Sequence, residues 1–212
     1  HIKDQYPEYA LALHCVYLPS IPVPSFEWQE LSKAQEDLTA GHNYFLCVAP
    51  IKRFTAILKE FSIFKKWQQT TMHLVFVFDH PKDKEAALLQ LKGYKFKQDI
   101  NIVCTHDICM EWLAATYAIL YEGVTFTKSN WILYAIEYEV PILFDAAMNL
   151  PEAWLQAGEV FSFTEEQALS NHFKLYYKDE IYRQSRARMG TEWLLKLKEE
   201  RSPFSMLDIT PI

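Results

Sequence analysis

The sequence predicts an α/β fold in which helices cover both faces of a parallel β-sheet. Two observations predict this class. From Asn43 onward, short apolar runs of strand length alternate with segments whose apolar residues recur every three or four positions, as on one face of a helix. The short runs are also continuously apolar instead of alternating with polar residues. Strands have this composition when both sides of the sheet are covered, and crossover helices join parallel strands.

The first 43 residues show no clear period. A short strand is expected over 14–17, the prolines between Leu18 and Ser25 are typical of a connector, and 27–38 are expected to form a polar helix. We therefore divide the chain into a linker segment, 1–43, and a domain over 44–212 that ends in a helical tail. The chain begins at His1 instead of methionine, so we expect it to be a piece of a longer polypeptide.

Six apolar runs have the length of strands, and they cover 44–49, 74–78, 100–104, 118–121, 140–144 and 160–163. Because the runs at 74–78 and 140–144 contain no charged residue, we expect them to be buried strands inside the sheet. Helices are expected between the runs, over 54–64, 85–91, 110–115, 129–137 and 151–157, and in the tail from Glu165 onward. The apolar stripe of the first helix consists of Phe54, Ile57, Leu58, Phe61 and Phe64.

Charge and glycine content exclude several function classes. The net charge of -6 and the isoelectric point near 5.7 argue against binding to a phosphate backbone, so no nucleic acid partner is expected. No two of the five glycines lie within twenty residues of each other, which excludes a G-x-G-x-x-G dinucleotide turn and a G-x-x-x-x-G-K-[ST] phosphate loop. No apolar run approaches the roughly 18 residues that span a bilayer, so no transmembrane segment is expected.

The four cysteines, Cys15, Cys47, Cys104 and Cys109, are too few for a disulfide scaffold in a chain of this length. We therefore expect reduced thiols and a cytoplasmic location. Cys104 and Cys109 are separated by four residues instead of the two that zinc sites favour. No metal is expected.

Several segments match a known family in order and spacing. Residues 44–48 (YFLCV) take the place of an opening strand, 133–142 (LYAIEYEVPI) are similar to the pattern LEAMACGVPVI, and 150–158 (LPEAWLQAG) are similar to LPEVVGDAG. From 44 to about 201 the chain resembles the C-terminal, nucleotide-sugar-binding domain of GT-B glycosyltransferases of family 4, also called group 1. The resemblance implies a Rossmann-like sheet, and residues 9–21 resemble the linker that enters this domain from an N-terminal half.

The chain departs from this family at the motif EGFGLPVLE, which binds the nucleotide sugar. Without a gap, the motif falls on 126–134 (FTKSNWILY), where Phe126 and Tyr134 replace both glutamates. In the family the first glutamate contacts the sugar and the second contacts the ribose. A carboxylate accepts hydrogen bonds from hydroxyl groups strongly, whereas a phenol does so weakly and a phenyl ring not at all. The alternative aligns Glu122 and Gly123 with the start of the motif and requires a gap.

The resemblance implies a set of ligand-binding residues. Those near the diphosphate are Lys52, Arg53, Ser129 and Asn130. Those near the ribose and base are Tyr134, His106 and Asp107, and those near the sugar are Phe126 and Glu152. Amide groups at a helix start favour phosphate, but Ser129 is equally suited to be a plain helix N-cap, and Asp107 and Glu152 also suit the first turn of a helix. No catalytic residue is assigned.

The resemblance implies that the chain binds a nucleoside diphosphate sugar, as a substrate and not as a cofactor. Transfer of the sugar would need an acceptor held by the N-terminal domain of the same polypeptide, which could also place the protein at a membrane surface. The loss of both glutamates supports a second hypothesis, a degenerate GT-B-like domain that serves as an interaction or scaffold module. An unrelated flavodoxin-like domain is a third.

Overall fold

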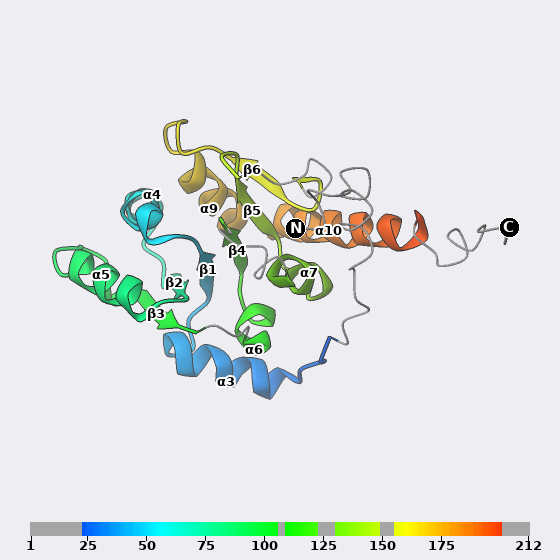
Figure 1. The fold of residues 1–212 in the computed structure, drawn as a ribbon, viewed down its shortest axis with the longest axis horizontal. Coiled ribbons are helices and arrows are strands. Elements are labelled where there is room, and N and C mark those ends of the chain that lie inside the picture. Colours follow the sequence, from blue (N-terminus) through cyan, green and yellow to red (C-terminus); the bar gives the residue numbers. More distant parts are fainter. Residues whose placement is uncertain (1–22, 106–108, 123–129, 149–154, 201–212) are drawn as a thin grey trace, which may run out of the picture.

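The computed structural model describes residues 23–105, 109–122, 130–148 and 155–200. Within these residues, six strands form one sheet in the order β3-β2-β1-β4-β5-β6 (Figure 1). They are β1 (Tyr44–Val48), β2 (His73–Phe78), β3 (Ile100–Cys104), β4 (Ala118–Tyr121), β5 (Ile142–Asp145) and β6 (Glu159–Phe161). Every neighbouring pair is parallel. The parallel sheet predicted from the apolar runs is therefore confirmed.

The strand order reverses at β1. From β1 the chain moves outward through β2 to β3, and it then returns to the other side of β1 to add β4, β5 and β6. Leu46 of β1 accordingly pairs with Val75 of β2 and with Ile119 of β4. The carboxyl ends of the strands share one edge of the sheet, called here the carboxyl edge. The reversal beside β1 is the switch point at which proteins of this architecture bind ligands.

Successive strand residues point to opposite faces of the sheet, and helices cover both faces (Figure 1). Phe45 and Phe76 belong to the core of the first face, and Leu46 and Phe144 belong to the core of the second. The helices of the first face are α4 (Phe54–Trp67), α5 (Pro81–Leu91) and α9 (Ala168–Lys178). Those of the second face are α3 (Trp28–Thr39), α6 (Met110–Ala114) and α7 (Asn130–Glu137).

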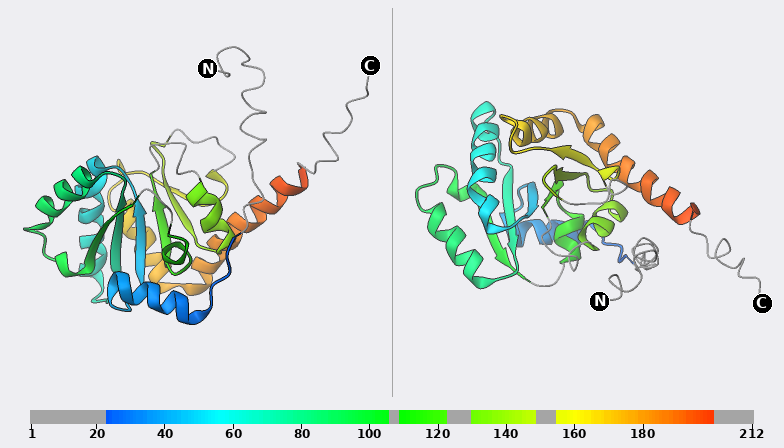
Figure 2. Two further views of the ribbon diagram at one scale, coloured as in Figure 1. Left: turned by 60° about the horizontal axis from the view of Figure 1, so that its bottom comes forward. Right: turned by 45° about the horizontal axis from the view of Figure 1, so that its top comes forward.

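The last described helix, α10 (Glu180–Glu200), contributes to both faces. Tyr182 near its start packs against the core of the first face, whereas Trp193 and Leu194 belong to the core of the second. Figure 2 shows its final turns, coloured orange to red, extending beyond the sheet. None of the described helices is both long enough and apolar enough to cross a membrane.

The predicted elements differ from the observed ones mainly at their ends. β2 and β5 lie inside the sheet and are buried along their whole length, as their charge-free runs predict. α5 begins at Pro81 instead of at 85, because proline and Asp83 both suit a first helical turn. β5 begins at Ile142, two residues later than predicted, because the turn that ends α7 has a left-handed residue at Glu139. The strand predicted over 14–17 and most of the helix predicted over 151–157 lie outside the described residues.

Candidate functional site

Charged residues lie at or just beyond the carboxyl ends of β1, β4 and β5, which are neighbours in the sheet. After β1 comes the short 3-10 helix η2 (Ile51–Arg53), which carries Lys52 and Arg53. Glu122 directly follows β4, and Asp145 is the last residue of β5. The Glu122 backbone N–H donates to the Val48 carbonyl at 2.8 Å, which holds the ends of β4 and β1 in register. The topology therefore brings these side chains together.

Arg53, Glu122 and Asp145 form a cluster of ion pairs, called here the Arg53 triad. The Arg53 Nε donates to both carboxylate oxygens of Glu122, at 2.9 and 3.1 Å, and its Nη2 donates to Asp145 Oδ2 at 2.8 Å. The Phe163 ring lies against the guanidinium, with its centroid 4.8 Å from Cζ. One side chain thus links the ends of three neighbouring strands and the segment that follows β6.

Most of the Arg53 triad is shielded from water. The side chains of Asp145, Glu122 and Arg53 are 1%, 10% and 26% exposed. Burial raises the pKa of the Glu122 carboxyl, although the hydrogen bond and charge of Arg53 act to lower it. The hydrogen bond with Glu122 raises the pKa of Arg53 above its usual value. With both carboxylates ionised, the triad carries one net negative charge.

The structure brings both basic candidates and the start of α7 to the carboxyl edge. Lys52 is exposed, whereas Arg53 is held in the triad. Asn130 is the first residue of α7, so the backbone N–H groups of the first turn, which have no partner within the helix, lie at the carboxyl edge. Tyr134 is 9% exposed and packs in the core of the second face. The other candidates lie outside the described residues: His106, Asp107, Phe126, Ser129 and Glu152.

Asp145 and Phe163 are not among the residues predicted from the sequence, and Glu122 enters there only as the start of a gapped motif. A sequence signal for the two carboxylates exists. Glu122 follows an apolar strand directly, and Asp145 comes directly after a predicted one. Such residues meet at one edge when the strands are parallel. Phe163 ends the strand predicted over 160–163, but an apolar residue at that place gives no signal of a charged site; in the structure it lies in the segment after β6.

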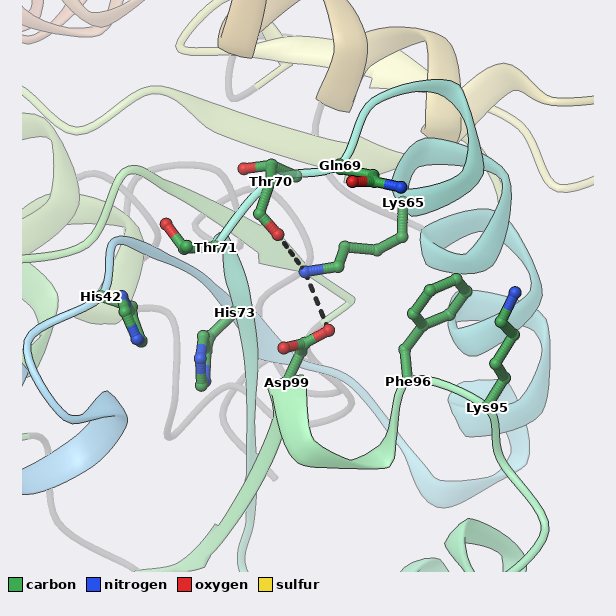
Figure 3. Close-up of a pocket in the computed structure, with 9 residues that line it drawn as sticks. All are labelled: His42, Lys65, Gln69, Thr70, Thr71, His73, Lys95, Phe96 and Asp99. Atoms are coloured by element: carbon green, nitrogen blue, oxygen red, sulfur yellow. Dashed lines mark hydrogen bonds and ion pairs between the residues drawn. The ribbon is translucent and has the colours of Figure 1, made fainter.

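A cavity of about 530 Å³ lies at the opposite edge of the sheet, where the strands begin (Figure 3). The residues that line it are His42, Lys65, Gln69, Thr70, Thr71, His73, Lys95, Phe96 and Asp99. Figure 3 shows the Lys65 ammonium pointing to Asp99 and Thr70. It donates to the Asp99 carboxylate at 2.8 Å and to the carbonyls of Thr70 and Met72 at 2.5 and 3.2 Å, so its three N–H groups all have partners.

The cavity is a weaker candidate than the carboxyl edge. Its buried cation is neutralised within the chain, and it lies at the end of the strands where this architecture does not bind ligands. His42 and His73 stack with their centroids 5.0 Å apart. Among the described residues, no three or more His, Cys, Asp and Glu side chains are arranged to hold a metal ion. We therefore place the candidate site at the carboxyl edge.

No protein-family model matches the sequence, and no similar curated protein is found. Solved structures are similar. WaaG, a glycosyltransferase involved in lipopolysaccharide biosynthesis, has a TM-score of 0.60 at 16% identity, over 88% of this chain and 53% of WaaG. The C-terminal domain of LpcC, a group 1 glycosyl transferase from Francisella tularensis, has a TM-score of 0.62 at 13% identity, over 82% of this chain and 93% of that domain. HepE from Anabaena, in complex with UDP-glucose, has a TM-score of 0.61 at 13% identity, over 85% of this chain and 51% of HepE.

The chain thus spans about half the length of WaaG and HepE and nearly all of the LpcC domain. At these identities the similarity shows the fold alone. The fold is that of the C-terminal domain of a GT-B glycosyltransferase, which confirms the fold that the sequence resemblance implies.

Proposed function

We propose that the chain is the nucleotide-sugar-binding domain of a glycosyltransferase, with the nucleoside diphosphate sugar at the carboxyl edge. The strand order carries this proposal, because it reverses at β1 and because α7, which follows β4, begins at the same edge. Open α/β sheets bind ligands at such a switch point, and amide groups at a helix start favour a diphosphate. Similarity to glycosyltransferases, one of them solved with UDP-glucose, supports this ligand class.

The chain's part in the reaction is to position the nucleotide sugar and to stabilise the leaving diphosphate. Lys52 supplies an exposed positive charge, and α7 supplies the unpaired backbone amides of its first turn, which begins at Asn130. Ser129, directly before this helix in the sequence, is proposed to contact the diphosphate as well. The residues proposed toward the ribose and base are Tyr134, His106 and Asp107, and those toward the sugar are Phe126 and Glu152. A second domain of the same polypeptide holds the acceptor, so this chain alone binds the nucleotide sugar without transferring it. The free thiols of the described cysteines, Cys47, Cys104 and Cys109, support a cytoplasmic location.

A second candidate function is a GT-B-like domain that has lost nucleotide binding and serves as an interaction or scaffold module. The Arg53 triad favours it, because the arginine proposed to bind phosphate already binds two carboxylates. The replacement of the motif glutamates by Phe126 and Tyr134 also favours it, because neither side chain can replace a carboxylate as an acceptor for sugar hydroxyls.

Calorimetric titration of the chain with UDP, ADP and GDP distinguishes the two functions. The transferase domain is expected to bind at least one of them saturably below millimolar concentration. The matching diphosphate sugar should bind about as tightly as the diphosphate alone, since both motif glutamates are replaced, including the one that contacts the sugar in the family. If none of the three nucleotides binds saturably at millimolar concentration, the interaction module becomes the better function.

A further inference from the structure

The guanidinium of Arg53 is the cation at the carboxyl edge whose shape best fits a diphosphate. An arginine fork binds carboxylate and phosphate oxygens with the same geometry. Here the Nε and Nη2 groups already donate to Glu122 and Asp145, over distances of 2.8 to 3.1 Å. A diphosphate that used these N–H groups would have to displace both carboxylates. Glu122 and Asp145 therefore occupy two of the three guanidinium nitrogens, and a phosphate that uses these donors competes with them.

The net charge of the Arg53 triad also disfavours an anion. Two carboxylates and one guanidinium give -2 + 1 = -1. The Asp145 and Glu122 side chains are only 1% and 10% exposed, so water screens their charges poorly and the repulsion of a nearby phosphate is strong. Lys52 is close enough for its charge to lower the pKa of the Glu122 carboxyl, which burial raises more strongly. Lys52 thus also interacts electrostatically with Glu122 of the triad.

Phe163 packs against the guanidinium. Its ring centroid lies 4.8 Å from the Arg53 Cζ, so the ring covers one side of the group. The Arg53 side chain nevertheless remains 26% exposed, so a ligand from solvent can approach it. Such a ligand meets an arginine that is well placed but already neutralised.

We infer that Glu122 and Asp145 are positioning residues that set the affinity of the carboxyl edge for nucleoside diphosphates, by holding Arg53 in competition with the phosphate groups. The inference rests on the proposed function, because it concerns the same edge and the same ligand. Neutralising either carboxylate changes the charge of the triad from -1 to 0 and leaves Arg53 in place with one partner. Neutralising both changes it to +1.

A triad with a purely structural role would behave differently. Loss of one carboxylate would lower the free energy of unfolding, because Arg53 would lose a partner, but it would not tighten nucleotide binding. A gain in affinity is therefore the result that separates the two roles. It also excludes general damage to the site, which would weaken binding.

The test is a calorimetric titration of the full 212-residue chain with UDP, followed by ADP and GDP if UDP does not bind. The variants are Glu122→Gln and Asp145→Asn, which keep the size of the side chain and remove one charge each. Glu36→Gln is the matched control. Glu36 is an exposed carboxylate on α3, which ends beside the start of β1 and therefore at the edge of the sheet opposite to the carboxyl edge. A triple variant that adds Arg53→Met to both neutral substitutions removes the cation as well. Circular dichroism verifies that each variant is folded, and either single variant alone is sufficient for the test.

We expect Glu122→Gln and Asp145→Asn each to bind UDP at least about tenfold more tightly than the wild type, which corresponds to about 1.4 kcal/mol. The control should bind like the wild type, and the triple variant should lose the gain. If wild type and single variants bind UDP equally, the inference is wrong and the proposed function stands. If only the neutral variants bind, the inference is supported and the wild-type chain is not a nucleotide-binding domain. If neither the wild type nor any variant binds UDP, ADP or GDP at millimolar concentration, both are overturned.

Discussion

Glu139 adopts a φ of 54° where α7 ends. Its N–H donates to the Ile136 carbonyl at 3.0 Å and the N–H of Val140 donates to the Ala135 carbonyl at 2.8 Å, which is the pattern of a Schellman cap. Glycine is the usual residue at this position, because a side chain in the left-handed region costs about 1–2 kcal/mol.

Glu139→Gly is therefore expected to raise the free energy of unfolding by about 0.5–1 kcal/mol, after the greater chain entropy of unfolded glycine is counted. Urea unfolding measures this change. Lys59→Gly is the control, because Lys59 is exposed in the middle of α4, and it should lower the free energy of unfolding by about 1 kcal/mol. A loss of stability in both variants would contradict the prediction.

Glu159, at the start of β6, contacts α9 and α10. Its Oε1 accepts a hydrogen bond from the Tyr182 hydroxyl, and its Oε2 lies 3.3 Å from His172 Nδ1. Burial alone would raise the pKa of this carboxyl, but its contacts with His172 and Tyr182 outweigh burial and hold the pKa at about 2. The ordinary value of 4.5 describes the same carboxyl in the unfolded chain.

The sign of the pH dependence follows from this difference. Since the folded pKa is lowered, ionised Glu159 stabilises the fold above about pH 4.5, and its contribution is lost as the pH falls from there toward 2. Glu159→Gln should lower the free energy of unfolding by about 1–3 kcal/mol at neutral pH. Thermal unfolding at several pH values should show the difference from wild type shrinking below about pH 4.5. A difference that does not change with pH would exclude this role for the charge.

At the level of elements, α9 packs on the first face of the sheet through buried residues that include Phe173. This side chain is fully buried and stacks on Phe45 of β1 with ring centroids 4.4 Å apart. It also meets the edges of the Phe61 and Phe64 rings of α4. The sheet, α4 and α9 therefore share one aromatic cluster.

Phe173→Ala should lower the free energy of unfolding by about 3–5 kcal/mol, because it removes a buried ring and leaves a cavity between two helices and a strand. Leu175→Ala is the control in the same helix, because its side chain is 37% exposed, and it should change stability much less. Guanidinium unfolding of both variants measures the contrast. Equal losses would show that α9 packs differently.

The whole molecule presents Lys52 at the carboxyl edge, beside the Arg53 triad. An exposed lysine that contacts a diphosphate contributes a charge-assisted hydrogen bond of about 1.5–3 kcal/mol. Lys52→Ala should therefore weaken UDP binding by roughly tenfold or more. Lys59→Ala is the matched control, because it removes an exposed lysine from the middle of α4. Equal affinities of the two variants in a calorimetric titration would remove Lys52 from the site.

The strands and helices could be predicted from the sequence because the burial of each element determines the spacing of apolar residues along it. In β1 the residues Tyr44 and Phe45 face opposite sides of the sheet and are both buried, so the strand reads as a continuous apolar run. In α4 only one side is buried, and Phe54, Ile57 and Phe61 recur at helical spacing. Helix ends were harder to place, because the turn at Glu139 depends on a backbone conformation that glutamate seldom adopts.

The α/β class, the parallel sheet and the basic residues after β1 could be predicted from the sequence, because each of these depends on neighbours along the chain. The partners of Arg53 could not be predicted in this way, because they come from other parts of the chain. Glu122 and Asp145 lie 69 and 92 residues further on, and they meet Arg53 because β4 and β5 are added beside β1. No local pattern records strand order. For this reason a residue predicted from the sequence to bind phosphate is found, in the fold, between two carboxylates.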